Sequence, residues 1–132
     1  MTTRILIATR KDNKVGHVHD PTSFRLGGVT GHAGVFTTSE DLSRFASIFL
    51  NNGEFCGQSI LSKGQISRMT MLDKKTKRGL GFDILSPYSN RPRGQYFSKG
   101  KSFGHTGFTG TSLWIDPIKN IFVIVLSNTV FA

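Results

Sequence analysis

Apolar side chains in the middle of the chain recur at a helical period. They stand at positions i, i+3, i+4, i+7 and i+8, which predicts an amphipathic helix over residues 37–52 with one buried face. Thr37 and Glu40 match a capping box at its start, and Gly53 is suited to end it. The face consists of Leu42, Phe45, Ala46, Phe49 and Leu50.

A second, shorter helix is expected after Ser62. Gln65 stands three residues later and completes a capping box with Ser62. Ile66 and Met69 are then expected on its inner face.

Alternating or continuous apolar runs dominate the second half of the chain and predict strands. Residues 79–85, 101–107, 111–117 and 121–128 are each bounded by turn-forming residues. The sequence DPIKN at 116–120 is expected to be the tight turn between the last two, so the last three form an antiparallel meander. Residues 121–126 are apolar throughout, which predicts a central strand covered on both faces. In the strand before it, one face is predicted to carry Thr111, Leu113 and Ile115, and the other Ser112, Trp114 and Asp116.

The order of these elements predicts an α+β fold, an antiparallel sheet with flanking helices. At 132 residues the chain has the length of one domain, and such a domain buries roughly two-thirds of its unfolded surface. We divide it into a glycine- and histidine-rich loop region over 1–36, a helical region over 37–72 and a sheet portion over 79–132. No run approaches the roughly 18 apolar residues of a membrane span, and Ile5–Ala8 is too short for a signal peptide core.

The net charge of +9 raises the question of a nucleic-acid partner. The basic residues gather at 73–79, 91–94 and 98–102, all of which read as loops, and no nucleic-acid motif accompanies them. A solvated basic surface is therefore favoured over a specific nucleic-acid site, and attraction to acidic surfaces is expected. Cys56 stands alone, so no internal disulfide forms, and both a periplasmic and a cytoplasmic location stay open.

Histidines in the first region raise the question of a metal site. His17 and His19 form a His-x-His pair beside Asp20, and His32 follows further on. The chain offers no further ligand at a diagnostic spacing, so we expect no metal and no cofactor, and hydrogen bonding by these histidines instead.

Small residues at 102–117, SFGHTGFTGTSLWIDP, indicate close approach to the backbone. Together with residues 27–53 (GGVTGHAGVFTTSEDLSRFASIFLNNG), 78–84 (RGLGFDI) and 123–128 (VIVLSN), this segment resembles the later part of serine β-lactamase-like hydrolases. That superfamily includes class C β-lactamases, penicillin-binding D,D-peptidases and related esterases. His105-Thr106-Gly107 stands where members carry Lys-Thr-Gly or His-Thr-Gly on the strand lining the active site.

The resemblance implies a role for each residue of this strand. The backbone N–H of Phe108 would donate to the oxyanion of the tetrahedral intermediate. Gly107 would leave the edge free for a substrate added as a further strand beside residues 107–109, up to Thr109. Thr106 would offer its hydroxyl to a substrate carboxylate, and His105 would supply donor or positive character near the nucleophile.

The nucleophile of the family belongs to a Ser-x-x-Lys at the start of a helix, followed by a Tyr-x-Asn or Ser-x-Asn element. Residues 98–101 (SKGK) and 88–90 (YSN) match these patterns by letter, but both are expected in loops, and we interpret them as chance matches. The chain is therefore expected to carry the oxyanion and substrate strand without the nucleophile, and to be inactive alone.

Relatives continue past the point where this sequence stops, so the chain is expected to be the C-terminal portion of an incomplete β-lactamase-like domain. One sheet face would then be exposed, which predicts self-association or binding to the rest of the domain. The substrate class stays open between β-lactams, D-amino-acid peptides and esters. Two other interpretations stay open as well: a non-catalytic module that binds peptides or cell-wall ligands, and, less favoured, a basic polyanion binder.

Overall fold

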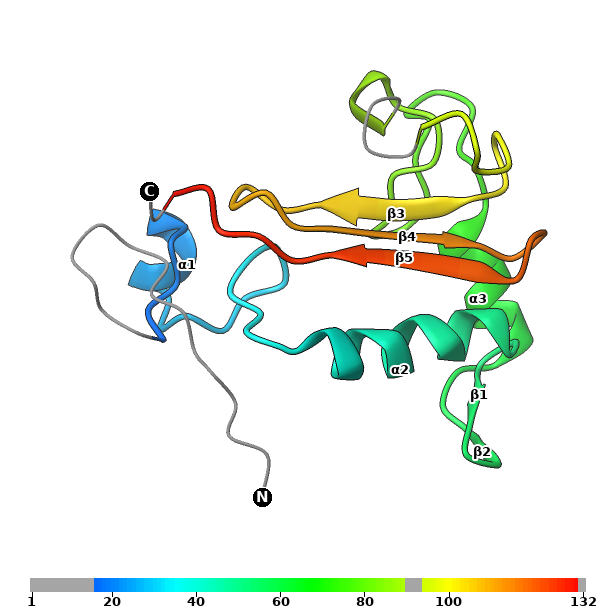
Figure 1. Ribbon diagram of the computed structural model, residues 1–132, viewed down its shortest axis with the longest axis horizontal. Coiled ribbons are helices and arrows are strands. Elements are labelled where there is room, and N and C mark those ends of the chain that lie inside the picture. The colour runs from blue at the N-terminus through cyan, green and yellow to red at the C-terminus, as the bar shows by residue number, and fades with distance from the viewer. Residues whose placement is uncertain (1–15, 90–93, 131–132) are drawn as a thin grey trace.

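The computed structural model describes residues 16–89 and 94–130 of the chain (Figure 1). It has the α+β class expected, with helices and antiparallel sheets in succession. The elements in order are α1 (Pro21–Arg25), α2 (Ser39–Leu50), β1 (Glu54–Phe55), β2 (Gln58–Ser59), α3 (Lys63–Thr70), the 3-10 turn η1 (Pro87–Ser89), β3 (Phe103–Thr106), β4 (Ser112–Asp116) and β5 (Ile121–Val125).

The predicted amphipathic helix is α2, and its N-cap lies one residue later than expected. The backbone N–H of Asp41 donates to the hydroxyl of Thr38 at 3.1 Å, so Thr38 and not Thr37 caps the helix. At the other end, the N–H of Gly53 donates to the Ile48 carbonyl at 2.7 Å with a φ of 98°. A Cβ at Gly53 would overlap the backbone of Leu61, which explains why this position is glycine.

The second predicted helix is α3, and its capping box is present. Ser62 and Gln65 bond each other's backbone N–H groups through their side chains. Between α2 and α3 the helical region also contains a short hairpin that the sequence analysis missed. Its strands β1 and β2 are joined by Cys56 and Gly57, both at positive φ, as a two-residue hairpin turn requires.

The predicted meander is confirmed as an antiparallel sheet in the order β3-β4-β5. Gly104 pairs with Trp114, which in turn pairs with Val123, so the three strands are in one register. The turn between β4 and β5 is held by Asp116, whose Oδ1 accepts from the backbone N–H groups of Ile118 and Lys119 at 3.0 and 3.2 Å. This side chain explains why the DPIKN segment turns where it does.

The expectation of a strand over 79–85 is wrong. The backbone makes only isolated bridges there, from Asp83 to Arg78 on one side and to Gly104 on the other. The N–H of Gly79 donates to the Phe82 carbonyl at 2.9 Å, so the segment turns back on itself before it can extend. Gly81, at a φ of 79°, supplies the conformation that this turn requires.

Within the described residues, 121–126 do not form a central strand. β5 lies at an edge of the described sheet, with β4 on one side. Ile121, Val123 and Val125 alternate with more buried neighbours and are 42, 44 and 48% exposed. An apolar run predicts burial on both faces, but the described residues supply cover for one face only.

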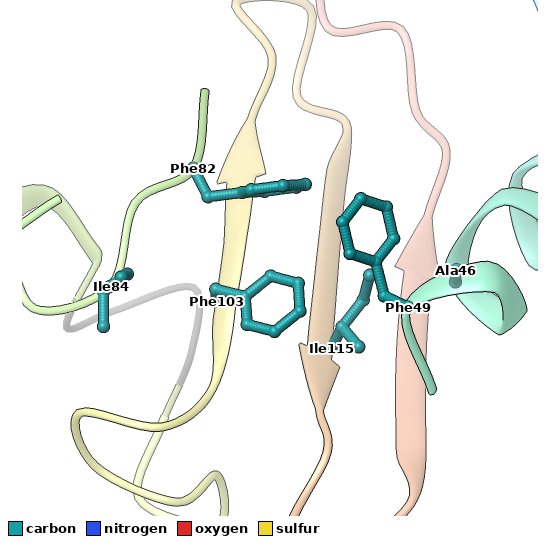
Figure 2. Packing of buried hydrophobic residues seen from close by; sticks show 6 residues of the cluster. All are labelled: Ala46, Phe49, Phe82, Ile84, Phe103 and Ile115. Atoms are coloured by element: carbon teal, nitrogen blue, oxygen red, sulfur yellow. The ribbon is translucent and has the colours of Figure 1, made fainter. Parts of the chain in front are cut away.

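The hydrophobic core lies between α2 and the sheet (Figure 1). Phe49 of α2 contacts Phe82 and Phe103 edge-to-face, with ring centroids 5.1 and 5.6 Å apart, and Ala46 and Ile115 are fully buried beside them (Figure 2). These rings tie the turn at 79–85 to β3 as well as to α2. The core thereby fixes the position of the segment that flanks β3.

Residues 16–36 are more ordered than the loop region predicted for them, because α1 forms within it. The carboxylate of Asp20 caps this short helix by accepting from the N–H of Ser23 at 2.7 Å. Ser23 is fully buried and donates to the Ala33 carbonyl, which closes the glycine-rich loop over the helix. Within residues 16–89 and 94–130, no helix is long and apolar enough to cross a membrane.

Candidate functional site

Among the residues that the structure describes, the outer edge of β3 is covered for only part of its length. Asp83 donates to the Gly104 carbonyl at 2.7 Å and accepts from the Gly104 N–H at 3.0 Å. Backbone groups along a strand point alternately to its two sides, so those of Thr106 point the same way as those of Gly104, and Phe108 follows in the turn. Within the described chain the N–H of Phe108 donates to no acceptor. We call residues 106–108 the open edge.

A tight turn fixes the end of this edge. The N–H of Gly107 donates to the Thr111 carbonyl at 2.7 Å, and the N–H of Gly110 donates back to Gly107 at 3.1 Å. Thr129 donates to the carbonyl of Thr109 at 2.9 Å and holds the turn from the far side. Gly107 is expected from the resemblance to leave room for a substrate. The structure gives a packing reason, because a Cβ there would overlap the Thr111 hydroxyl.

The imidazole of His105 has a partner on each ring nitrogen. Nδ1 lies 2.7 Å from the carbonyl oxygen of Thr106, and Nε2 lies 2.5 Å from a guanidinium nitrogen of Arg78. A guanidinium can only donate, so Nε2 accepts and the ring proton is on Nδ1. The positive charge beside the strand is therefore on Arg78 in this arrangement.

Phe108 presents its side chain to solvent and stacks on one histidine. Its ring is 81% exposed and lies 5.0 Å from the His19 ring at an interplanar angle of 22°. This contact brings the segment before α1 beside the open edge (Figure 1). His19 and His105 therefore both lie near the turn, from parts of the chain 86 positions apart in sequence.

The other two histidines have local partners. His17 packs on Phe24 with centroids 5.8 Å apart, and His32 Nε2 lies 3.0 Å from Asp20 Oδ1. The Ser23 N–H and then the His32 ring hold the pKa of Asp20 below its ordinary value. No cluster of three or more metal-binding side chains occurs among the residues that the structure describes.

One pocket beside α1 does not coincide with the open edge. It is a shallow depression beside α1, and none of its lining residues comes from the β3–β4 hairpin. The residues that line it are Gly16, His17, Val18, Phe24, Gly27 and Gly28.

The described residues of the letter matches to the two family patterns lie in turns. Ser98 lies in a turn and not at a helix start, and its N–H donates to Asp116 at 2.7 Å while its carbonyl accepts from Ser102. Tyr88 lies in η1 and is 82% exposed. Asn90, the last residue of the second match, is outside the described residues. The interpretation of residues 98–101 as a loop is confirmed.

Sequence reasoning missed Arg78 and Asp83. Arg78 was grouped with the solvated basic residues of 73–79, although its guanidinium contacts His105. Asp83 was placed in a strand, although its backbone covers β3 as a single bridge. The one available signal was their place in the segment 78–84, which belongs to the same resemblance as the His-Thr-Gly strand.

Comparisons with known proteins identify the class of this fold and site. The family model for Beta-lactamase matches residues 5–132. A putative D-alanyl-D-alanine carboxypeptidase of Escherichia coli O157:H7 is 32% identical over 115 residues, which are 86% of this chain and 26% of the relative. A protein of the same description from Salmonella typhi is 30% identical over 115 residues, 86% of this chain and 27% of the relative.

The chain therefore belongs to the Beta-lactamase family, a part of the serine β-lactamase and D,D-peptidase superfamily of hydrolases. It spans about a quarter of the length of the curated relatives it matches.

Proposed function

We propose that the open edge of β3 is the substrate strand of a serine hydrolase that acts by acyl transfer. The observation that carries the proposal is the N–H of Phe108, which follows His-Thr-Gly directly and has no acceptor within the described chain. A tetrahedral intermediate places negative charge on the former carbonyl oxygen, and one such donor is worth about 3 kcal/mol of barrier lowering. The tight turn at residues 107–110 holds this donor in place before substrate arrives.

In this proposal the substrate lies along the open edge as an added strand. It lies beside residues 107–109, where the Phe108 N–H is free of the turn's own hydrogen bonds, and the hydroxyl of Thr106 meets its carboxylate. A serine outside this 132-residue sequence attacks the carbonyl carbon. The bond to the leaving group breaks, and water then releases the acyl group from the serine. Ser98 is not that serine, because its backbone is tied into a turn against the buried Asp116.

The relatives' descriptions name the substrate to test first. They are putative D-alanyl-D-alanine carboxypeptidases, so a peptide ending in D-Ala-D-Ala ranks ahead of β-lactams and esters for this chain. The competing function is a module that binds such a peptide at the same edge without turnover. The hydrolase and the binding module are distinguished by whether an enzyme that contains this chain and the nucleophile turns the peptide over.

The location of the nucleophile is tested by exposing the purified chain to a fluorophosphonate probe and locating any adduct by mass spectrometry. We expect no adduct and no release of D-alanine from a diacetyl-Lys-D-Ala-D-Ala peptide. An adduct at Ser98 that disappears in Lys101→Ala would show that the nucleophile is in this chain.

The oxyanion role is tested in a chimera in which this chain replaces the matching 115 residues of the E. coli relative, with the intact relative as reference. Phe108 is the second residue of a β-turn, a position that accepts proline, so Phe108→Pro removes the N–H and keeps the turn. We expect a loss of about 100- to 1,000-fold in kcat, while Phe108→Leu keeps activity. Equal activity of the two variants would refute the role, and an inactive chimera beside an active relative would favour the binding module.

A further inference from the structure

Arg78 is held at the boundary between the covered and the open parts of β3. Its backbone pairs with Asp83, which pairs with Gly104, and Gly104 pairs with Trp114. Arg78, which precedes the turn at Gly79, is thus in line with the paired residues Asp83, Gly104 and Trp114. Arg78 is half-buried, and its N–H donates to the Thr76 hydroxyl at 3.3 Å. The backbone pairing and the hydrogen bond to Thr76 therefore fix the position of the Arg78 main chain.

The contact with His105 fixes where that side chain ends. One guanidinium nitrogen lies 2.5 Å from Nε2 of His105, whose other ring nitrogen bonds the Thr106 carbonyl. With both nitrogens engaged, the imidazole has neither a donor nor an acceptor to offer a ligand at the open edge. The guanidinium has five N–H donors and uses one of them here, so it retains donors for a ligand.

No carboxylate of the described chain neutralises Arg78. The carboxylate of Asp73, in the same loop, accepts from the Lys75 and Thr76 N–H groups. The carboxylate of Asp83 is buried and bonds Ser86. The described ion pairs all lie elsewhere, on α2 and beside α1. An unpaired guanidinium held next to an open strand edge is an arrangement that binds a carboxylate in fork geometry.

We infer that Arg78, oriented by His105, is the specificity-determining residue of the open edge and binds the free carboxylate of a peptide laid along it. The inference rests on the proposed function, and it assigns the recognition charge to a residue outside the His-Thr-Gly triplet. The guanidinium itself supplies the positive charge, so recognition of the carboxylate requires none from His105.

Peptide binding to the purified chain tests the inference without any need for turnover. Diacetyl-Lys-D-Ala-D-Ala is compared with the same peptide ending in a carboxamide, by titration followed through the backbone amide signals of residues 106–109. We expect Arg78→Met to weaken binding of the acid about tenfold and Arg78→Lys to restore part of it, with the carboxamide unaffected. Lys74→Gln removes one charge from the same loop without touching His105, and we expect it to leave both peptides unchanged.

The outcomes separate this inference from the proposed function. If the wild-type chain binds neither peptide at residues 106–109, the proposed function is wrong. If it binds acid and carboxamide equally, or if Lys74→Gln weakens the acid as much as Arg78→Met, Arg78 is not the determinant.

A measurement without ligand tests the Arg78–His105 contact itself. In the nitrogen-15 spectrum of the His105 ring, we expect a protonated Nδ1 and a bare, hydrogen-bonded Nε2, and a shift of Nε2 to its unbonded value in Arg78→Met. A wild-type ring protonated on Nε2 would overturn the inference.

Discussion

Asp83 exchanges two backbone hydrogen bonds with Gly104, at 2.7 and 3.0 Å, and makes no such pair further along β3. This single bridge decides how much of the strand a ligand can reach. Among the described residues it covers the edge up to Gly104, and the Phe108 N–H further along has no acceptor. A full strand over 79–85 would have had the length to cover the edge beside His-Thr-Gly, so the turn at Gly79 and Gly81 is what leaves the candidate site open.

The cap of α2 gives a direct test of the one-residue difference between expectation and structure. Thr38→Ala removes the acceptor of the Asp41 N–H and should lower the free energy of unfolding by about 1 kcal/mol. Thr37→Ala should change it by less than about 0.5 kcal/mol. Urea denaturation followed by circular dichroism measures both. A larger loss of stability in Thr37→Ala than in Thr38→Ala would show that Thr37 caps the helix.

Gly104 tests how closely β3 and β4 approach. A Cβ there would overlap the Leu113 carbonyl and lie 2.7 Å from two ring atoms of Trp114, which is 2% exposed and has no room to move. Gly104→Ala should therefore destabilise the chain by about 2 kcal/mol or more in urea denaturation. Gly31→Ala is the control, because nothing lies within 4 Å of a Cβ there and its φ is ordinary. Equal stability of the two variants would contradict the packing of this sheet.

The carboxylate of Asp116 makes the free energy of unfolding depend on pH in the acid range. Burial acts to raise the pKa of its carboxyl, but hydrogen bonds from the Ser98, Lys119 and Ile118 backbone outweigh it and hold the pKa below the ordinary 3.8. A lowered folded-state pKa stabilises the fold above the unfolded value, and this contribution is lost as the pH falls below it.

The test compares the wild type with Asp116→Asn across pH by urea denaturation. The variant should be less stable at about pH 6, and the difference should shrink as the pH falls below 3.8. A difference that stays constant with pH would show that the carboxylate charge contributes nothing.

The exposed face of β5 leads us to expect self-association. Ile121, Val123 and Val125 form an apolar row, each 42 to 48% exposed, on a strand that lies at the edge of the described sheet. Sedimentation velocity should show oligomers that grow with concentration, and Val123→Lys should shift the chain towards the monomer. Val29→Lys, at a valine that is 92% exposed elsewhere, adds the same charge and should have no such effect. A wild-type monomer at every concentration would refute this expectation.

Local signals in the sequence carried most of the element assignments. The capping box at Ser62 and Gln65, the stripe around Ala46 and Phe49 and the turn at Asp116 each lie within a few residues of the structure they specify. Patterns of this kind depend on backbone period and side-chain reach, which neighbouring residues decide.

One error was local: the β1–β2 turn at Cys56 and Gly57 had a signal, a glycine in a two-residue loop, that was overlooked. The other errors arose where a distant part of the chain decides the outcome. The segment 79–85 had the composition of a strand, but the core contacts of Phe82 with Phe49 and Phe103 hold it as a turn. The apolar run at β5 indicated burial, but the sequence does not show which part of the structure would cover that strand.

The sequence by itself determined α2 and α3, the order of the meander and the His-Thr-Gly signature of the family, because each depends on residues close together along the chain. Only the tertiary structure decided that Asp83 stops at Gly104, that His19 reaches Phe108 and that Arg78 reaches His105. Those contacts join residues 21 to 89 positions apart, and no periodicity encodes them. The open edge and its guanidinium exist because packing around the aromatic core brings these separate segments together.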